Sequence, residues 1–208
     1  MKANGFTLVE LMVGLVIAML CMIMMLMFFK HHSQVSMSSS RDAQYDAQLR
    51  TGMLVMEKLV QNAGFGSGQT DDIGIGTYAG HPALFWRFRP DLTETPIQYS
   101  CQGFAEEIVA EGQQFLHRLI SLNLSNCGND TVFNDLSWES SQAILLVKSS
   151  DNSPIFEFQL SLGNCRPFGI DEHQSGLMQL LMSARRQHGT GLGESIQSSV
   201  CLNNIKAV

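Results

Sequence analysis

An uninterrupted apolar run near the N-terminus constrains this chain most. From Phe6 to Phe29 it reads FTLVELMVGLVIAMLCMIMMLMFF, twenty-four residues in which Glu10 is the one charged side chain. As an α-helix this run spans about 36 Å, enough to cross a hydrocarbon core of roughly 30 Å. A buried core helix is rarely apolar on every face, and the apolar region of a secretory signal is usually only about 7–15 residues long. The run therefore predicts a membrane-spanning helix that ends at Lys30.

Glu10 lies inside this apolar run, four residues after Phe6. A carboxylate within a membrane is costly, and it usually marks a function and has a partner. The run itself contains no cationic side chain. Cleavage after Gly5 would create a cation, the α-amino group of Phe6. The alternative is that Glu10 only reaches the headgroup layer.

The string MKANGFTLVE resembles the class III leader and cleavage site of type IV prepilins and pseudopilins. The shared features are a short basic leader, Gly5, apolar Phe6, and Glu10 four positions later. The resemblance implies a leader over residues 1–5, cleavage between Gly5 and Phe6 by a prepilin peptidase, and N-methylation of Phe6. It also implies that Glu10 pairs with the N-terminus of a neighbouring subunit. In a water-poor helix bundle such a pair would set the axial register.

A second string, LVQNAGFGSG at residues 59–68, resembles the segment after the long helix in PilW-type minor pilins. Major pilins commonly carry a helix-breaking proline in this helix, whereas the first proline here is Pro82. We therefore interpret the chain as a minor pilin that helps initiate or assemble a type IV pilus. A J-type pseudopilin of type II secretion is the alternative within the family.

The resemblance also implies the partners and the location. The partners would be other minor pilins, the major pilin, the prepilin peptidase, the inner-membrane assembly machinery and membrane lipid. The protein would cross the inner membrane once, with its C-terminal domain in the periplasm, and then enter a pilus that serves adhesion and twitching motility. The positive-inside rule gives little preference for either orientation, because Lys2 precedes the apolar run and Lys30 follows it.

The expected fold is α+β and pilin-like: a long N-terminal helix, membrane-spanning over 6–29, packed on an antiparallel β-sheet. Residues 30–63 are predicted to continue the helix, although SMSSS at 36–40 is a poor helix former and a separate helix after a linker is the alternative. An apolar stripe recurs at spacings of three and four, formed by Leu49, Met53, Met56, Val60 and Ala63. Glycines at 64–80 predict the end of the helix and a long loop.

The segment 64–208 is predicted to be a β-rich globular domain. Strand patterns cover residues 84–89, 120–125, 142–148, 156–162 and 195–202. The turn-rich SSDNSP between the third and fourth of these predicts a hairpin. Residues 177–186 suit either a helix or a strand, and the resemblance favours a strand.

Four cysteines lie beyond the apolar run, at Cys101, Cys127, Cys165 and Cys201. Their even number predicts two disulfides in an oxidising periplasm, with three possible pairings. We choose the sequential pairs, Cys101–Cys127 and Cys165–Cys201. Reduced cysteines in a cytoplasmic domain are the alternative. Cys21, inside the apolar run, is expected to act as a small hydrophobe.

The sequence contains no recognisable group of catalytic or metal-binding residues. We therefore expect that the protein is not an enzyme and that it binds no metal or cofactor. A membrane-anchored periplasmic enzyme with dispersed catalytic residues is the alternative. Four histidines, at 81, 117, 173 and 188, lack metal-ligand spacing and are expected at the surface or partly buried. Glu106 and Glu107 are adjacent, so in a strand they face opposite ways. We expect them at a solvated edge.

The net charge of −6 argues against a nucleic-acid partner. One strand pattern nevertheless interleaves aromatic residues with arginines, FWRFR at Phe85–Arg89, which is compatible with a DNA-uptake pilin that stacks on single strands. The preferred interpretation is an amphipathic strand with Trp86 and Phe88 in the core. The adjacent Arg185 and Arg186 are expected to form a salt bridge with an acidic side chain at the rim of the domain.

Overall fold

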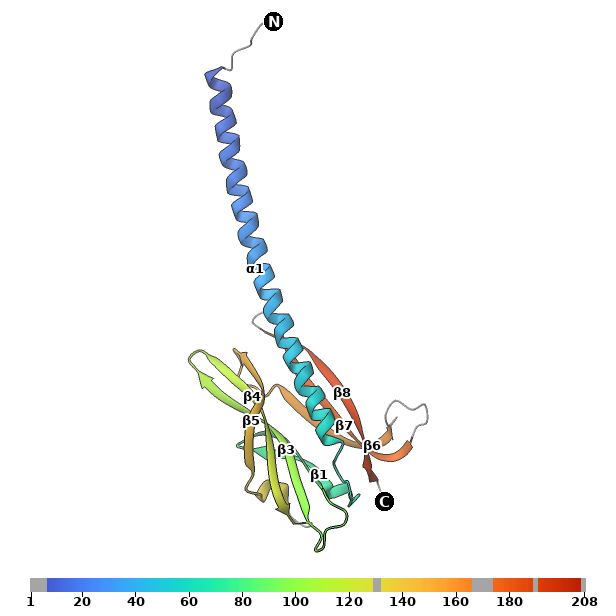
Figure 1. Ribbon diagram of the computed structural model, residues 1–208. Helices are drawn as coiled ribbons and strands as arrows, with labels where there is room; N and C mark the ends of the chain where they lie inside the picture. The colour runs from blue at the N-terminus through green and yellow to red at the C-terminus, as the bar shows by residue number, and fades with distance from the viewer. Residues whose placement is uncertain (1–6, 129–131, 166–173, 189–190, 207–208) are drawn as a thin grey trace. The chain divides into compact units, whose positions relative to one another are not determined.

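The computed structural model describes residues 7–128, 132–165, 174–188 and 191–206. The chain divides into two compact units, Met1–Ala43 and Gln44–Val208. One helix, α1 (Leu8–Val60), runs through the boundary between them, and all strands lie in the second unit (Figure 1).

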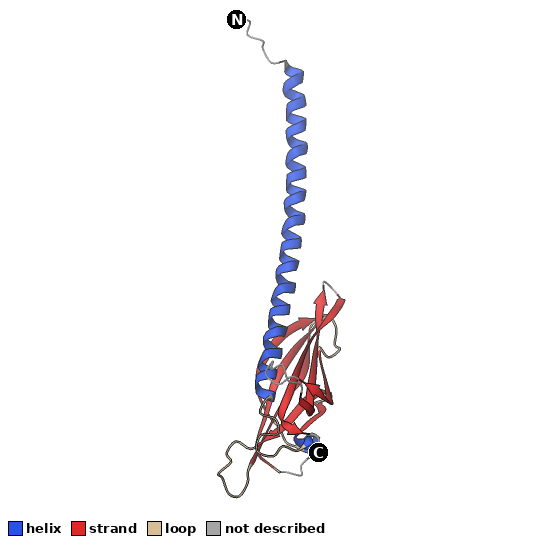
Figure 2. Ribbon diagram, turned by 90° about the vertical axis from the view of Figure 1, so that its right-hand side faces the viewer, coloured by secondary structure: helices blue, strands red, loops and turns tan. Residues whose placement is uncertain are grey.

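Helix α1 is continuous over 53 residues, as predicted (Figure 2). The serine-rich stretch at 36–40 does not break it. Ser38 donates its hydroxyl to the carbonyl of Val35 at 2.9 Å, so this side chain bonds to the preceding turn of the helix. The alternative of a linker followed by a separate helix is therefore wrong.

The strands form two antiparallel sheets, and the predicted α+β fold is confirmed (Figures 1 and 2). The five-stranded sheet has the order β1-β2-β3-β4-β5, with bounds Ile73–Tyr78, His81–Phe88, Tyr99–Glu111, Gln114–Cys127 and Glu139–Ser149. The three-stranded sheet has the order β6-β7-β8, with bounds Phe156–Cys165, Gln174–His188 and Gly191–Lys206. Two short 3-10 helices, η1 (Thr70–Asp72) and η2 (Phe133–Asp135), flank the larger sheet. The ambiguous segment 177–186 is a strand, as the resemblance implied.

Two local predictions are wrong. The segments 142–148 and 156–162 do not form a hairpin, because β5 pairs with β4 and β6 pairs with β7 in the other sheet. The residues between them cross from one sheet to the other. The glycine-rich stretch 64–80 is also only partly a loop, since it contains β1. A strand is recognised in a sequence by alternating apolar and polar side chains. Gly74 and Gly76 have no side chains, so β1 does not show this alternation.

Gly64, four residues after the end of α1, adopts a backbone conformation that favours glycine. Gly64 has a φ of +72°, and its N–H donates to the carbonyl of Arg87 at 2.9 Å. A Cβ at this position would lie 2.5 Å from Cγ1 of Ile205. The chain therefore leaves α1 through a left-handed residue that has no room for a side chain.

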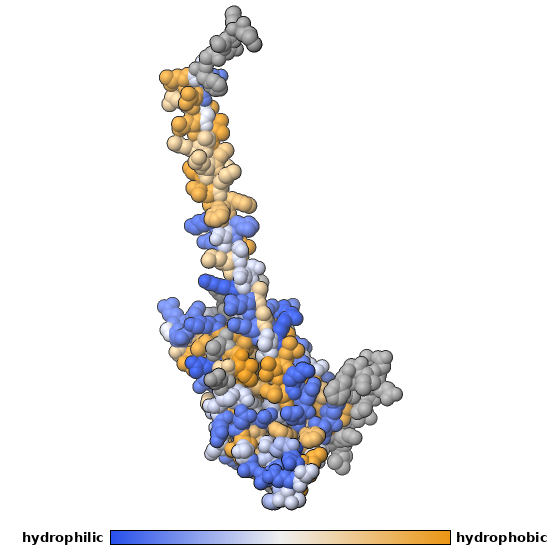
Figure 3. Space-filling view, in the orientation of Figure 1, coloured by the Kyte–Doolittle hydropathy of each residue, from blue (hydrophilic) through white to orange (hydrophobic). Residues whose placement is uncertain are grey.

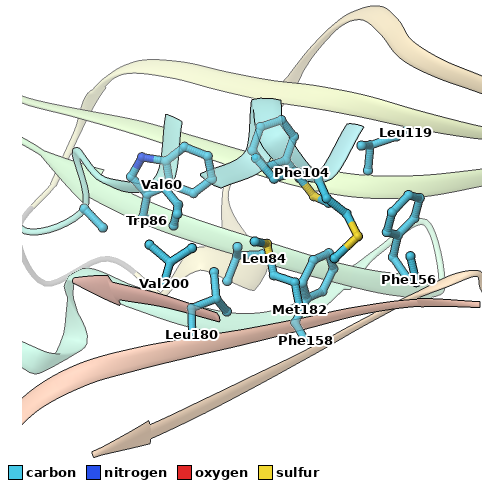
Figure 4. Packing of buried hydrophobic residues seen from close by; sticks show 14 of the residues in the cluster. Val60, Leu84, Trp86, Phe104, Leu119, Phe156, Phe158, Leu180, Met182 and Val200 are labelled. Atoms are coloured by element: carbon cyan, nitrogen blue, oxygen red, sulfur yellow. The ribbon is translucent and has the colours of Figure 1, made fainter. Parts of the chain in front are cut away.

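The core of the second unit forms around the apolar stripe of α1. All five predicted stripe residues are buried: Leu49, Met53, Met56, Val60 and Ala63. They pack with side chains of both sheets, among them Leu84 and Trp86 from β2 and Leu180 and Met182 from β7 (Figure 4). Burial of this stripe holds the second half of the helix against the strands.

Trp86 lies in the core and Phe88 packs against it, as predicted, but strand β2 is buried on both faces, so the prediction of an amphipathic strand is wrong. Leu84 and Trp86 join the main core, while Phe85 lies in a second cluster on the opposite face. There the ring of Phe85 stacks on Trp138 and Phe133, with centroid separations of 4.8 and 5.9 Å. The covering residues, Phe133 in η2 and Trp138 just before β5, are about fifty positions away in the sequence.

Candidate functional site

The N-terminus of α1 carries the residues that the sequence singled out. Gly5 and Phe6, the predicted cleavage site, lie outside the described residues. Thr7 directly precedes the helix, and its N–H and hydroxyl both donate to Oε2 of Glu10 at 3.0 Å. The N–H of Glu10 donates back to the Thr7 hydroxyl at 3.3 Å. These reciprocal bonds form a capping box, which satisfies donors at the start of the helix.

The capping box places the carboxylate of Glu10 at the positive end of the helix dipole. Across residues 7–128, 132–165, 174–188 and 191–206, no ion pair reaches Glu10. Its pairing with another subunit's N-terminus stays a prediction. The role of Thr7 was not predicted, although Thr-x-x-Glu before an apolar run is the sequence signal of a capping box.

The first part of α1 exposes its apolar side chains on every face. Its large hydrophobic residues between Leu8 and Phe29 are at least 49% exposed, and Figure 3 shows this stretch as an apolar surface. By length and composition the helix can cross a membrane, and its most apolar stretch is not buried within the protein. The exposed surface supports membrane anchoring, because water is a poor solvent for so much apolar area. Cys21 lies here as an exposed free thiol.

The disulfide Cys101–Cys127 is present, as predicted, and links the start of β3 to the end of β4 across a Cα–Cα distance of 5.9 Å. Cys201 on β8 is also disulfide-bonded. The side chain of Cys165, its predicted partner, lies outside the described part of the chain. A bonded cysteine pair in the second unit fits an oxidising compartment.

The strand segment Phe85–Arg89 does not form a nucleic-acid surface. Arg87 is only 1% exposed. Its Nε donates to Oδ1 of Asp72 at 2.9 Å, and its Nη1 donates to the carbonyl of Gly128 at 2.7 Å. Since Phe85 and Trp86 are buried as well, none of the three can stack on a base. The burial of these three residues argues against the DNA-binding alternative for this strand.

Glu106 is buried, so its predicted place at a solvated edge is wrong. It pairs with the buried His117, which the sequence placed at or near the surface. Glu107 faces the other way, as predicted, and pairs with Arg118 at 3.5 Å. The alternation of the strand was therefore right, but the inward side chain finds a partner on β4 that no sequence spacing reveals.

The remaining polar candidates form no metal site within the described residues. His81 is half-buried, and His173 and the side chain of His188 lie outside the described part. The arginine pair behaves as expected: Arg186 pairs with Asp46 at 3.6 Å, and Arg185 lies 4.0 Å from Glu157.

Residues 1–26 match the family model of the prokaryotic N-terminal methylation motif. This motif supports a type IV pilin- or pseudopilin-like protein, and the long apolar helix with the antiparallel sheets after it is consistent with a pilin-like α+β fold. Residues 1–26 thus carry a class III prepilin leader, which implies processing by a prepilin peptidase and assembly with pilus machinery. No curated protein and no solved structure matches the chain.

Proposed function

We propose that this chain is a minor pilin that helps initiate or assemble a type IV pilus together with other minor pilins and the major pilin. The observation that carries the proposal is the exposed apolar helix headed by the methylation motif and by Glu10. The lack of a proline in α1 and the LVQNAGFGSG string support the minor-pilin role. The role is structural and needs no catalytic residue.

In this proposal the first half of α1 is stored in the inner membrane and then packs against other subunits. The globular unit faces the periplasm, which the Cys101–Cys127 disulfide supports. Lipid offers little hydrophobic drive for helix association, so close packing and polar pairing must supply the contacts. Gly14 and Ala18 are one turn apart, a small-xxx-small pattern that lets helices approach closely.

Glu10 supplies the polar pair. Thr7 donates two hydrogen bonds to one carboxylate oxygen of Glu10, Oε2. The methylated amine of Phe6 on a neighbouring subunit would form an ion pair with the carboxylate. In the apolar interior of a filament an unpaired carboxylate is strongly unfavourable, so the pair selects one axial register.

The test is Glu10→Gln in the full chain, compared with Asp42→Asn, which removes a carboxylate from α1 outside the apolar run. Both variants should insert in the membrane, as judged by resistance to carbonate extraction. Only Glu10→Gln should lower the amount of this protein in sheared pili. Normal incorporation of Glu10→Gln would refute the pairing role.

Intact-mass analysis of the membrane-purified protein tests the processing. We expect a chain that begins at Phe6 and carries one added methyl group. A mature protein that retains residues 1–5 would contradict the proposal. A J-type pseudopilin of type II secretion is the second candidate, and co-purification with secretion subunits in place of pilus subunits would favour it.

A further inference from the structure

A buried carboxylate–imidazole pair lies within the globular unit, and the proposed function does not use it. Glu106 on β3 and His117 on β4 are 1% and 2% exposed. Nδ1 of His117 lies 2.6 Å from Oε1 of Glu106. Ile108 is the residue directly opposite His117, so Glu106 lies two residues along on the same face of the sheet.

Glu106 fastens the crossover between the two sheets. The N–H of Ile155 donates to both of its carboxylate oxygens, at 2.8 and 3.0 Å, and the N–H of Phe156 donates to Oε2 at 3.0 Å. Phe156 is the first residue of β6. Since every neighbour here is a donor, the site is built for an ionised carboxylate. That carboxylate holds the start of the smaller sheet against the larger one.

His117 faces a second acceptor through its other nitrogen. Nε2 lies 2.9 Å from the carbonyl oxygen of Asp151, in the connection that runs from β5 to β6. A neutral imidazole has only one N–H, so it cannot donate to both Glu106 and Asp151. With an ionised Glu106, two acceptors on opposite ring nitrogens therefore favour the doubly protonated imidazolium. Burial lowers the pKa of His117, but the hydrogen bonds to Glu106 and Asp151 and the negative charges of both residues together raise it, and the net shift is upward.

Other titratable or charged groups face this pair from α1, from β7 and from the connection itself. Tyr45 donates its hydroxyl to the carbonyl of Arg185 at 3.1 Å, and burial, Glu106 and Asp46 raise its pKa to about 12. The guanidinium of Arg185 donates to the carbonyl of Pro154 and keeps its charge throughout. Hydrogen bonds from Ser153 lower the pKa of the Asp151 carboxyl. His117 is thus the member of this group that we expect to lose its charge as the pH rises above the ordinary histidine pKa.

We propose that Glu106 and His117 form a pH-sensitive clasp between the two sheets. With His117 protonated, both acceptors are satisfied and residues 150–155 are held against β3 and β4. When Nε2 of His117 loses its proton, its lone pair faces the carbonyl oxygen of Asp151 and the hydrogen bond between them is lost. Residues 150–155 are then released from β3 and β4. The clasp lies wholly within Gln44–Val208 and does not depend on the proposed role in assembly.

The direction of the pH effect follows from the pKa of His117. Because this pKa is raised in the folded state, the stabilisation is complete below the ordinary histidine pKa of about 6.5. It is lost as the pH rises through the folded-state value. The clasp is therefore closed in mildly acidic medium and open in alkaline medium.

The first measurement is the ¹⁵N NMR spectrum of the histidine rings in the full chain in detergent micelles. We expect both ring nitrogens of His117 to be protonated below pH 6.5, and one of them to lose its proton as the pH rises further. A neutral His117 with a single N–H below pH 6.5 would overturn the proposal.

Hydrogen exchange of the full chain tests the opening. The amides of Ile155 and Phe156 should lose protection by about tenfold between pH 6 and 9, after correction for intrinsic exchange rates, because a charge-assisted network is weakened. Equal protection at the two pH values would contradict the clasp.

The variant His117→Gln keeps a donor for Glu106 but cannot titrate, so it should abolish the pH dependence of this protection. His81→Gln changes a half-buried histidine outside the network and should keep the wild-type dependence. Retention of the wild-type dependence in His117→Gln would overturn the proposal. If His117→Gln does not fold, the ring titration in the wild-type chain still decides the question.

Discussion

The two halves of α1 differ in what covers their apolar side chains. Between Leu8 and Phe29 the large hydrophobic residues are exposed all round, whereas from Leu49 to Val60 a single stripe is buried by the sheets. Both stretches are regular helix. Helix formation therefore does not distinguish them, and the pattern of apolar residues decides which half needs lipid or another subunit and which half needs its own domain.

The largest expected effect comes from a charge placed in each half. Met56→Asp buries a carboxylate in the core at a cost of several kcal/mol, so the globular unit should fail to fold. Met19→Asp places the same charge in the exposed half, where it should impair membrane insertion by about 2.5–3.5 kcal/mol and leave the globular unit folded. Protease resistance of Gln44–Val208 and membrane extraction measure the two outcomes. If both variants lost the protease-resistant unit, the two halves would not be independent.

A smaller effect is expected when leucine is truncated in each half. Leu49→Ala should destabilise the globular unit by about 2–5 kcal/mol, because the core cannot fully close the cavity. Leu15→Ala, the matched change in the exposed half, should leave the free energy of unfolding of that unit unchanged. Denaturant unfolding of the full chain in detergent, followed by tryptophan fluorescence, compares them. Similar shifts for both variants would contradict the division of α1.

The next effect is a dependence on pH confined to the globular unit. Raising the pH through the folded-state pKa of His117 should cost about 1.5 kcal/mol of stability, since one hydrogen bond to a charged group is lost. The exposed half of α1 has no buried titratable group, so its helicity should not change. Thermal unfolding at pH 6 and 9 by circular dichroism measures both signals. A globular unit that melts at a higher temperature at pH 9 would reverse the expected sign.

The smallest effect concerns the half-exposed ion pair between Asp46, in the second half of α1, and Arg186 on β7. Asp46→Asn should change the stability of the globular unit by less than about 1 kcal/mol, because solvent screens such pairs. A matched Asp72→Asn breaks the buried pair with Arg87 and should cost about 3–5 kcal/mol. Equal effects in denaturant unfolding would show that burial does not set the strength of these pairs.

The features predicted from the sequence are those that local pattern controls. The continuation of α1 and its buried stripe followed from spacing and residue type, whereas the even number of cysteines predicted disulfides and left three pairings open, of which Cys101–Cys127 was a choice. The division of the strands into two sheets did not, because β5 and β6 are separated by a turn-rich segment that suits a hairpin equally well. The contacts of Glu106 with Ile155 and Phe156, which hold the crossover in place, join residues some fifty positions apart.

By itself, the sequence determined the chemistry of the N-terminus and the helix below it. The methylation motif, the Thr-x-x-Glu cap and the apolar run each depend on residues a few positions apart. They can therefore be recognised from the sequence without the tertiary structure. Only the tertiary structure decided which charged side chains are buried. Arg87 and Glu106 sit in segments that suit a solvent-facing position equally well. Their burial depends on Asp72, His117 and backbone groups that reach them only when distant strands come together, because a buried charge is stable only beside its partner.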